Sequence, residues 1–76
     1  MPTILRKNGF RFMIYVHDHE PAHVHATKAG TVLVVMLDPM LIRENRGMNR
    51  GDINQALSII ADHRDLIISE WNRLHP

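Results

Sequence analysis

Four of the chain's six histidines fall within ten residues, in the segment HDHEPAHVHA at residues 17–26. Imidazole titrates near neutral pH and is the commonest metal ligand in proteins, so this segment could bind a metal ion or transfer protons. His23 and His25 are two positions apart, and side chains alternate between the faces of a β-strand, so both should project from one side of a strand. No other segment carries comparable chemistry, and the functional prediction therefore rests on this one.

A metal site could be formed by His19, His23 and His25. Three protein ligands with an open coordination position suit a catalytic divalent ion such as zinc. Other donors in the same segment are available as alternatives: His17, Asp18 and Glu20. The pattern His-x-His is a weak metal signal by itself, so the sequence permits a metal cofactor without requiring one.

The same three histidines could instead act as acid and base without a metal. Cleavage of RNA through the adjacent 2′-hydroxyl needs a base, an acid and a cation that binds the phosphate. Arg64 would complete this catalytic group, and Arg43 and Arg46 are the further candidates for binding the substrate phosphate. These residues together would be sufficient for ribonuclease-type phosphodiester cleavage.

A structural role for the same residues stays open beside both functional ones. The histidines could hydrogen-bond to the backbone near Pro21 and pack against Tyr15 or Trp71. Arg64 interrupts an apolar helix face, and a buried charge without a partner is costly. An ion pair would resolve that cost, and three carboxylates could provide it: Asp18, Glu20 and Asp38.

Two β-hairpins are predicted to position the histidines. Asn8-Gly9 is a strong signal for a two-residue hairpin turn, and it fixes the register of the strands on either side. The pairs predicted there are Lys7 with Phe10, Leu5 with Phe12 and Ile4 with Met13. Ala29-Gly30 predicts a second turn, and the pairs predicted around it are His25 with Val34 and His23 with Met36.

One long C-terminal helix is predicted over about residues 50–74, with Asn49 or Asp52 at its start. Its apolar residues recur at spacings of three and four along one face: Ile53, Leu57, Ile60, Ile67, Trp71 and Leu74. Ile59 and Leu66 fall off this face and form a second small apolar patch, either a subunit contact or ordinary surface. The predicted fold class is α+β, a four-stranded, mostly antiparallel sheet over about residues 3–37, a loop at 38–49 and this helix.

Composition limits the classes of protein to which the chain can belong. It has 76 residues, nine Lys or Arg against eight Asp or Glu, and no cysteine. This length predicts a single domain spanning residues 1–76, and the lack of cysteine excludes disulfides and thiolate metal sites. The balanced charge lacks the basic bias usual in nucleic-acid binders. The N-terminus is not a signal peptide and the longest apolar run, residues 32–37, is too short to cross a bilayer, so we expect a cytoplasmic protein without a membrane partner.

Several short motifs together resemble a known family. They are Pro-Thr-Ile at the start, Gly-Phe-Arg-Phe from residue 9, Tyr15-x-x-Asp18-His19-x-Pro21-x-His23-x-His25, Asn45-x-Gly47, His63-Arg64 and Trp71-Asn72. They resemble the small bacterial domain-of-unknown-function family numbered forty-one sixty, over nearly the whole chain. The resemblance implies a gene context similar to that of toxin–antitoxin modules, and hence a toxin role. It implies no established catalytic residues.

The expected function is that of a toxin-like component of a bacterial toxin–antitoxin module that acts on RNA through the histidine cluster. The alternative is a non-catalytic protein-binding module, or a metal-binding domain, that acts through sheet or helix contacts. We also expect a homodimer or a complex with a cognate small antitoxin-like protein. The strand at 31–37 is apolar on both faces, and a single helix cannot cover both.

Overall fold

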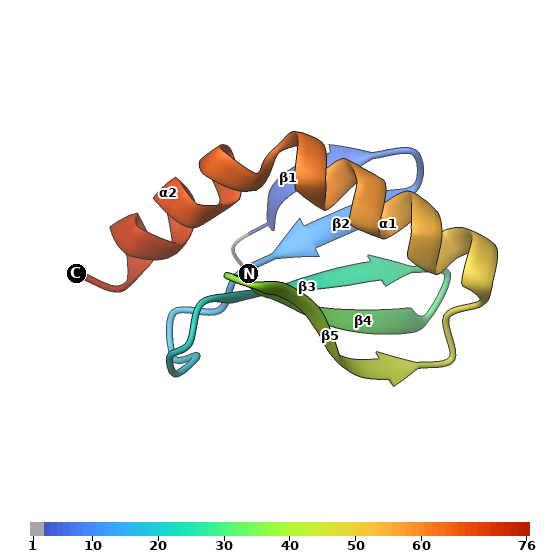
Figure 1. Ribbon diagram of the computed structural model, residues 1–76, viewed down its shortest axis with the longest axis horizontal. Coiled ribbons are helices and arrows are strands. Elements are labelled where there is room, and N and C mark those ends of the chain that lie inside the picture. Colours follow the sequence, from blue (N-terminus) through green and yellow to red (C-terminus); the bar gives the residue numbers. More distant parts are fainter. Residues whose placement is uncertain (1–2) are drawn as a thin grey trace.

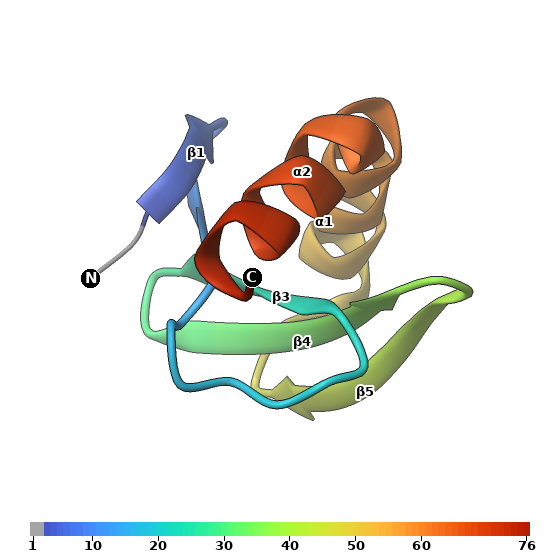
Figure 2. The ribbon, with the colours of Figure 1, turned by 90° about the vertical axis from the view of Figure 1, so that its left-hand side faces the viewer.

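The computed structural model describes residues 3–76, so Pro2 of the N-terminal motif lies outside the described residues. Its elements follow in the order β1 (Thr3–Lys7), β2 (Phe10–Met13), β3 (His23–Lys28), β4 (Thr31–Leu37), β5 (Met40–Arg46), α1 (Arg50–Asp62) and α2 (Arg64–Leu74). The strands form one antiparallel sheet in the order β1-β2-β3-β4-β5. Both helices lie on one face of this sheet (Figures 1 and 2). The α+β class is thus confirmed, whereas the predictions of four strands and one helix are wrong.

The first hairpin has the predicted turn. Asn8 and Gly9 have φ angles of 53° and 82°, the left-handed values that a two-residue turn of this kind needs. Two of the predicted pairs are confirmed: Lys7 with Phe10, and Leu5 with Phe12. The predicted pair of Ile4 with Met13 is wrong, because Ile4 is an extra residue in β1 and Thr3 lies opposite Met13 instead.

The second hairpin is confirmed in turn and register. His23 lies opposite Met36 and His25 lies opposite Val34. The next residues along β3, Val24 and Ala26, are fully buried in the core beneath the helices. Because side chains alternate along a strand, the two histidines project from the face of the sheet that the helices leave uncovered.

Residues 40–46 form β5, although the sequence predicted a loop over 38–49. This strand pairs with β4 alone and lies at the edge of the sheet. Nearly all of its side chains are exposed. Edge strands commonly carry charged residues, which discourage pairing with other chains, so a strand of this kind lacks the apolar alternation by which buried strands are recognised.

The predicted single helix is divided at His63. The N–H of His63 donates to the carbonyls of both Ile59 and Ile60, and its ring Nδ1 donates to the Ile59 carbonyl at 2.9 Å. No apolar residue between Ile60 and Ile67 holds this stretch to the sheet, and the helical path bends there (Figure 1). The bend lets α2 pass over the end of the sheet where β3 begins, so that Trp71 reaches His23.

One core lies between the sheet and the helices. It contains the core-facing residues of the strands and the apolar face of both helices: Phe10, Phe12, Ile14, Val24, Ala26, Leu33, Val35, Leu37, Met48, Ala56, Ile59, Ile60, Ile67 and Trp71. Ile59 is buried, so the predicted surface patch of Ile59 with Leu66 is wrong and only Leu66 is exposed. Asn49 begins α1 as predicted, because its side-chain oxygen accepts from the Asp52 N–H at 2.8 Å. No helix within residues 3–76 is long and apolar enough to cross a membrane.

Candidate functional site

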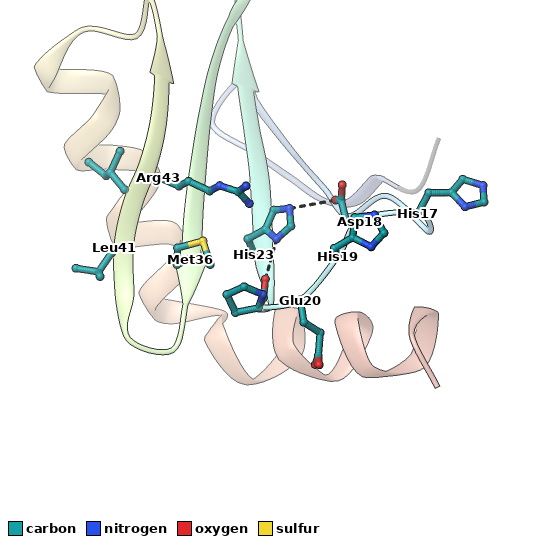
Figure 3. A pocket seen from close by; sticks show the side chains of 10 residues that line it. His17, Asp18, His19, Glu20, His23, Met36, Leu41 and Arg43 are labelled. Carbon is teal, nitrogen blue, oxygen red and sulfur yellow. Dashed lines mark hydrogen bonds and ion pairs between the residues drawn. The ribbon is translucent and has the colours of Figure 1, made fainter.

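Asp18 lies beside both histidines of β3 because a tight turn folds its side chain back. The Asp18 N–H donates to the Tyr15 carbonyl at 3.1 Å, and the Tyr15 N–H donates to Asp18 Oδ2 at 3.2 Å. The same carboxylate oxygen lies 3.4 Å from His23 Nε2 and 3.8 Å from His25 Nδ1. Figure 3 shows the Asp18 carboxylate facing the His23 ring. One ligand atom from each of the three residues lies within 4.8 Å of the others.

His23 has both ring nitrogens committed. Its Nδ1 lies 2.9 Å from the Pro21 carbonyl oxygen, which can only accept a hydrogen bond, so Nδ1 carries a proton. In the neutral ring Nε2 then presents a lone pair to the negative carboxylate of Asp18. A proton on Nε2, a water molecule that donates to both atoms or a metal ion would each relieve the contact between these two electron-rich atoms. Metal-binding histidines commonly donate their other ring N–H to a backbone carbonyl in this way.

The Asp18 oxygen is farther from both imidazoles than a hydrogen bond allows. A charged N–H···O bond between His23 and Asp18 would be about 2.7–2.9 Å long. The observed separations from the Asp18 oxygen are 3.4 and 3.8 Å. Two ligands that each lie about 2.1 Å from a tetrahedral ion are separated by about 3.4 Å. The spacing from Asp18 is therefore compatible with ligands of one ion, and the two imidazole nitrogens, which lie within 4.8 Å of each other, would move closer together on binding it.

His25 is suited to act as a neutral ligand. Burial lowers the pKa of His25, and this effect outweighs the neighbouring Asp18 carboxylate, which raises it. Its Nδ1 is buried and has no hydrogen-bond partner within residues 3–76. The edge of the His25 ring meets the Tyr15 ring at a centroid distance of 4.8 Å, which fixes the orientation of the imidazole. A neutral, oriented nitrogen that lacks a partner is what a metal ligand requires.

The lowered pKa of His25 predicts a pH dependence of stability. The folded state binds fewer protons than the unfolded state below about pH 6.5, where an unperturbed histidine becomes charged. The chelator-treated protein should therefore lose stability as the pH falls below that value. The Tm should fall between pH 7 and pH 5, and this fall should be smaller for His25→Gln than for the wild-type chain. Thermal melts at the two pH values measure the difference. An exposed loop variant, His17→Gln, serves as the control, and an equal loss in all three proteins would contradict the prediction.

Two of the three residues, Asp18 and His23, line a pocket of about 590 Å³, and His25 lies behind them. The pocket is lined by the loop before β3 and by the facing parts of β3, β4 and β5: His17, Asp18, His19, Glu20, Pro21, His23, Met36, Leu41, Ile42 and Arg43. Arg43 is the extra residue of a bulge, since Val34 pairs with Glu44 whereas Val35 pairs with Ile42. Bulges often redirect a side chain beside a functional site. Figure 3 shows Arg43 extending across the sheet toward His23.

The structure brings together some of the predicted site residues and separates others. His19 lines the pocket but is not among the three clustered ligands, whose third member is Asp18. Arg64 forms the structural ion pair that was predicted as its alternative role. Its Nε donates to the Leu37 carbonyl at 2.9 Å, and its Nη2 lies 3.3 Å from Asp38. Arg46 forms an ion pair with its strand neighbour Glu44.

Comparison with known proteins gives one family. The family model described as Domain of unknown function (DUF4160) matches residues 9–72. The matched segment contains the whole histidine segment and Arg43, and it agrees with the resemblance found from the motifs. No match was found among curated proteins or among solved structures.

Proposed function

This chain belongs to the family described as Domain of unknown function (DUF4160), and from its own geometry we propose that it is a metal-dependent hydrolase of phosphate esters. The divalent ion would be bound by Asp18, His23 and His25. The observation that carries the proposal is the convergence of their three ligand atoms within 4.8 Å, together with the His23 Nδ1 bond to Pro21. This arrangement directs Nε2 toward the carboxylate.

The donor set selects the class of metal. Two imidazole nitrogens and one carboxylate oxygen suit zinc and neighbouring transition metals better than magnesium or calcium, which prefer oxygen ligands. Catalytic zinc sites have three protein ligands and leave one position for water or substrate. The pocket lined by Asp18 and His23 would give that position access from outside.

The proposed reaction uses the ion and Arg43 together. An ion held by Asp18, His23 and His25 would supply a water of lowered pKa as the nucleophile. Attack of that water on phosphorus would release one proton to solvent and break the bond from phosphorus to the leaving oxygen, which would take up a proton from solvent. The Arg43 guanidinium, which faces the same pocket, is placed to neutralise the charge that develops on the phosphoryl oxygens.

Metal-free catalysis by the histidines is the weaker alternative. A general base must offer a free nitrogen to the proton that it takes from the substrate. His23 offers none, because Nδ1 donates to Pro21 and Nε2 faces Asp18. His17 and His19 line the pocket as exposed side chains, and neither forms a hydrogen bond within residues 3–76. His25 has an unpartnered Nδ1, but this atom is buried and His25 does not line the pocket.

The toxin role implied by the resemblance remains part of the proposal, since hydrolysis of cellular RNA would arrest growth. Association with a second copy or a small antitoxin-like protein also remains a proposal. It is supported by Leu41 and Ile42, which are 58% and 46% exposed on the edge strand β5. Light scattering at micromolar concentration tests self-association, and a monomer would leave only the heterologous partner.

Hydrolysis of a chromogenic phosphodiester, bis(p-nitrophenyl) phosphate, tests the activity. Chelator-treated wild-type protein should be inactive, and Zn²⁺ or Mn²⁺ should restore turnover in proportion to the bound metal. Arg43→Gln should lower the rate and leave metal binding intact, because Arg43 contacts substrate and not the ion. The His23→Gln variant, purified by the same procedure, is the control for contaminating hydrolases. Activity that persists in chelator, or in His23→Gln, would reject the proposal.

A further inference from the structure

We propose that the uncovered face of the sheet binds the phosphate backbone of a single-stranded polynucleotide along a row of arginines. The row consists of Arg6, Arg11 and Arg46, and we call it the arginine row. The inference deepens the proposed function, on which it rests, by naming the class of phosphate ester that enters the pocket.

The strand register places these arginines on one line across the sheet. Arg6 lies opposite Arg11, Arg11 opposite Thr27, Thr27 opposite Val32, and Val32 opposite Arg46. Paired residues of neighbouring strands share a face, and the flanking Phe10 and Phe12 are buried under the helices, so the line runs over the uncovered face. Four strand spacings make it about 19 Å long.

Two members of the arginine row, Arg6 and Arg11, carry positive charge that no carboxylate within residues 3–76 neutralises. Arg6 and Arg11 stand directly opposite each other, an arrangement of like charges that destabilises a sheet. Within residues 3–76, neither of them nor Arg43 forms an ion pair with a carboxylate. Arg11 Nε is buried without a partner among the same residues. The turn beside them adds a pocket of about 390 Å³ that is lined by Arg6, Lys7 and Arg11. A chain of phosphates would satisfy these groups.

The acidic groups on the same face leave Arg6 and Arg11 uncompensated. Glu44 neutralises Arg46, whereas the Asp18 carboxylate lies beside the ring nitrogens of His23 and His25. The chain as a whole has a formal charge of only +1, so a basic surface can arise in it only by local clustering. Local clustering of Lys or Arg is the electrostatic feature that polynucleotide binding requires.

The arginine row runs beside the metal site. Met13 lies opposite His25, two residues along the strand from Arg11, a step of about 6.6 Å. The Arg11 guanidinium reaches toward this neighbouring row, because its Nη2 lies 3.3 Å from the Met13 sulfur. A backbone that follows the arginine row therefore passes about 6.6 Å from His25 and about 13 Å, or roughly two nucleotides, from His23 at the pocket.

Recessed ligands favour a single strand over a duplex. His23 is only 4% exposed, and the His25 and Asp18 side chains are about one-fifth exposed. A rigid duplex could contact the rim of the pocket but could not bring a phosphate down to these atoms. A flexible single strand can bend one phosphate inward while its neighbours stay on the arginines.

Fluorescence anisotropy with a labelled single-stranded RNA 12-mer of mixed sequence tests the inference. The full chain is titrated in chelator over a range of salt concentrations, with DNA of the same sequence and duplex RNA as parallel probes. The double variant Arg6→Gln/Arg11→Gln should bind at least about tenfold more weakly at low salt. Its slope of log affinity against log salt should be smaller by about 1.4, since each phosphate contact contributes about 0.7 on a single strand. Similar affinities for RNA and DNA would support recognition of the backbone alone.

Arg73→Gln is the matched control, because it removes one arginine from the far side, where Arg73 pairs with Glu70. This variant should bind like the wild-type chain. Equal affinity of the double variant and Arg73→Gln would overturn the inference, as would tighter binding of duplex than of single strands. Because binding is measured in chelator, loss of the metal proposal would leave this result unchanged, and the two failures are distinguishable.

Discussion

Replacing Asp18 with asparagine is expected to lower the metal-dependent hydrolysis rate by more than about 100-fold. Loss of an outer partner of a metal ligand costs about 10–100-fold in affinity or activity, and Asp18 is proposed to contact the ion directly. Asparagine keeps an oxygen that can accept from the Tyr15 N–H, so the turn that holds the side chain should persist. The rate of bis(p-nitrophenyl) phosphate hydrolysis at saturating Zn²⁺ measures the effect.

The matched control for this variant is Glu20→Gln, two residues further along the same loop. Glu20 is exposed and points away from His23 in Figure 3. It should keep the wild-type rate, although it removes the same charge from the same segment. If Asp18→Asn and Glu20→Gln were equally active, Asp18 would not be a metal ligand.

Replacing Trp71 with alanine is expected to unfold much of the protein. Trp71 is 2% exposed and lies in the core, with its ring 5.2 Å from that of His23 and stacked on His75 at 3.9 Å. Truncation of a buried tryptophan costs about 3–5 kcal/mol, a large part of the roughly 5–15 kcal/mol that stabilises a typical domain. The Tm measured by circular dichroism should fall by at least about 12 °C, since each kcal/mol shifts a domain of this size by about 4–8 °C.

Leu66→Ala provides the comparison, because Leu66 is also on α2 but is 46% exposed. A surface substitution of this kind should change stability by less than about 0.5 kcal/mol. A similar, small Tm shift in both variants would show that α2 is not held to the sheet by Trp71.

Local patterns were enough to predict the hairpins and the placement of the two histidines. The Asn8-Gly9 turn fixes its own geometry, and a fixed turn sets the register of both strands. The period-two alternation then puts His23 and His25 on one face whatever covers the sheet. The open question was which face that is, because the strand at 31–37 is apolar on both sides. The structure resolves it, since Leu33 and Val35 face the helices.

The parts that the sequence did not predict depend on contacts between distant segments. Arg64 bonds to the carbonyl of Leu37, 27 residues earlier, and no spacing rule connects the two. Arg43 was predicted as a phosphate-binding candidate, but the bulge that places it at the pocket lies in β5, a strand whose polar composition hid it. Asp18 could have been chosen over His19 as the third ligand, because an aspartate three residues after Tyr15 can close a turn on it. The hydrogen bonds that orient the Asp18 side chain are seen only in the folded loop.

Calorimetric titration of Zn²⁺ into chelator-treated protein, purified without a polyhistidine tag, would decide whether the three ligands form a metal site. The wild-type chain should bind one ion per chain at pH 7, and His23→Gln and Asp18→Asn should each weaken that binding by more than about 100-fold, beyond the cost of losing an outer partner. Both variants should keep the circular dichroism spectrum of the wild-type chain. Absence of saturable binding by the wild-type chain, or unchanged binding by His23→Gln, would contradict the metal site and with it the proposed hydrolysis.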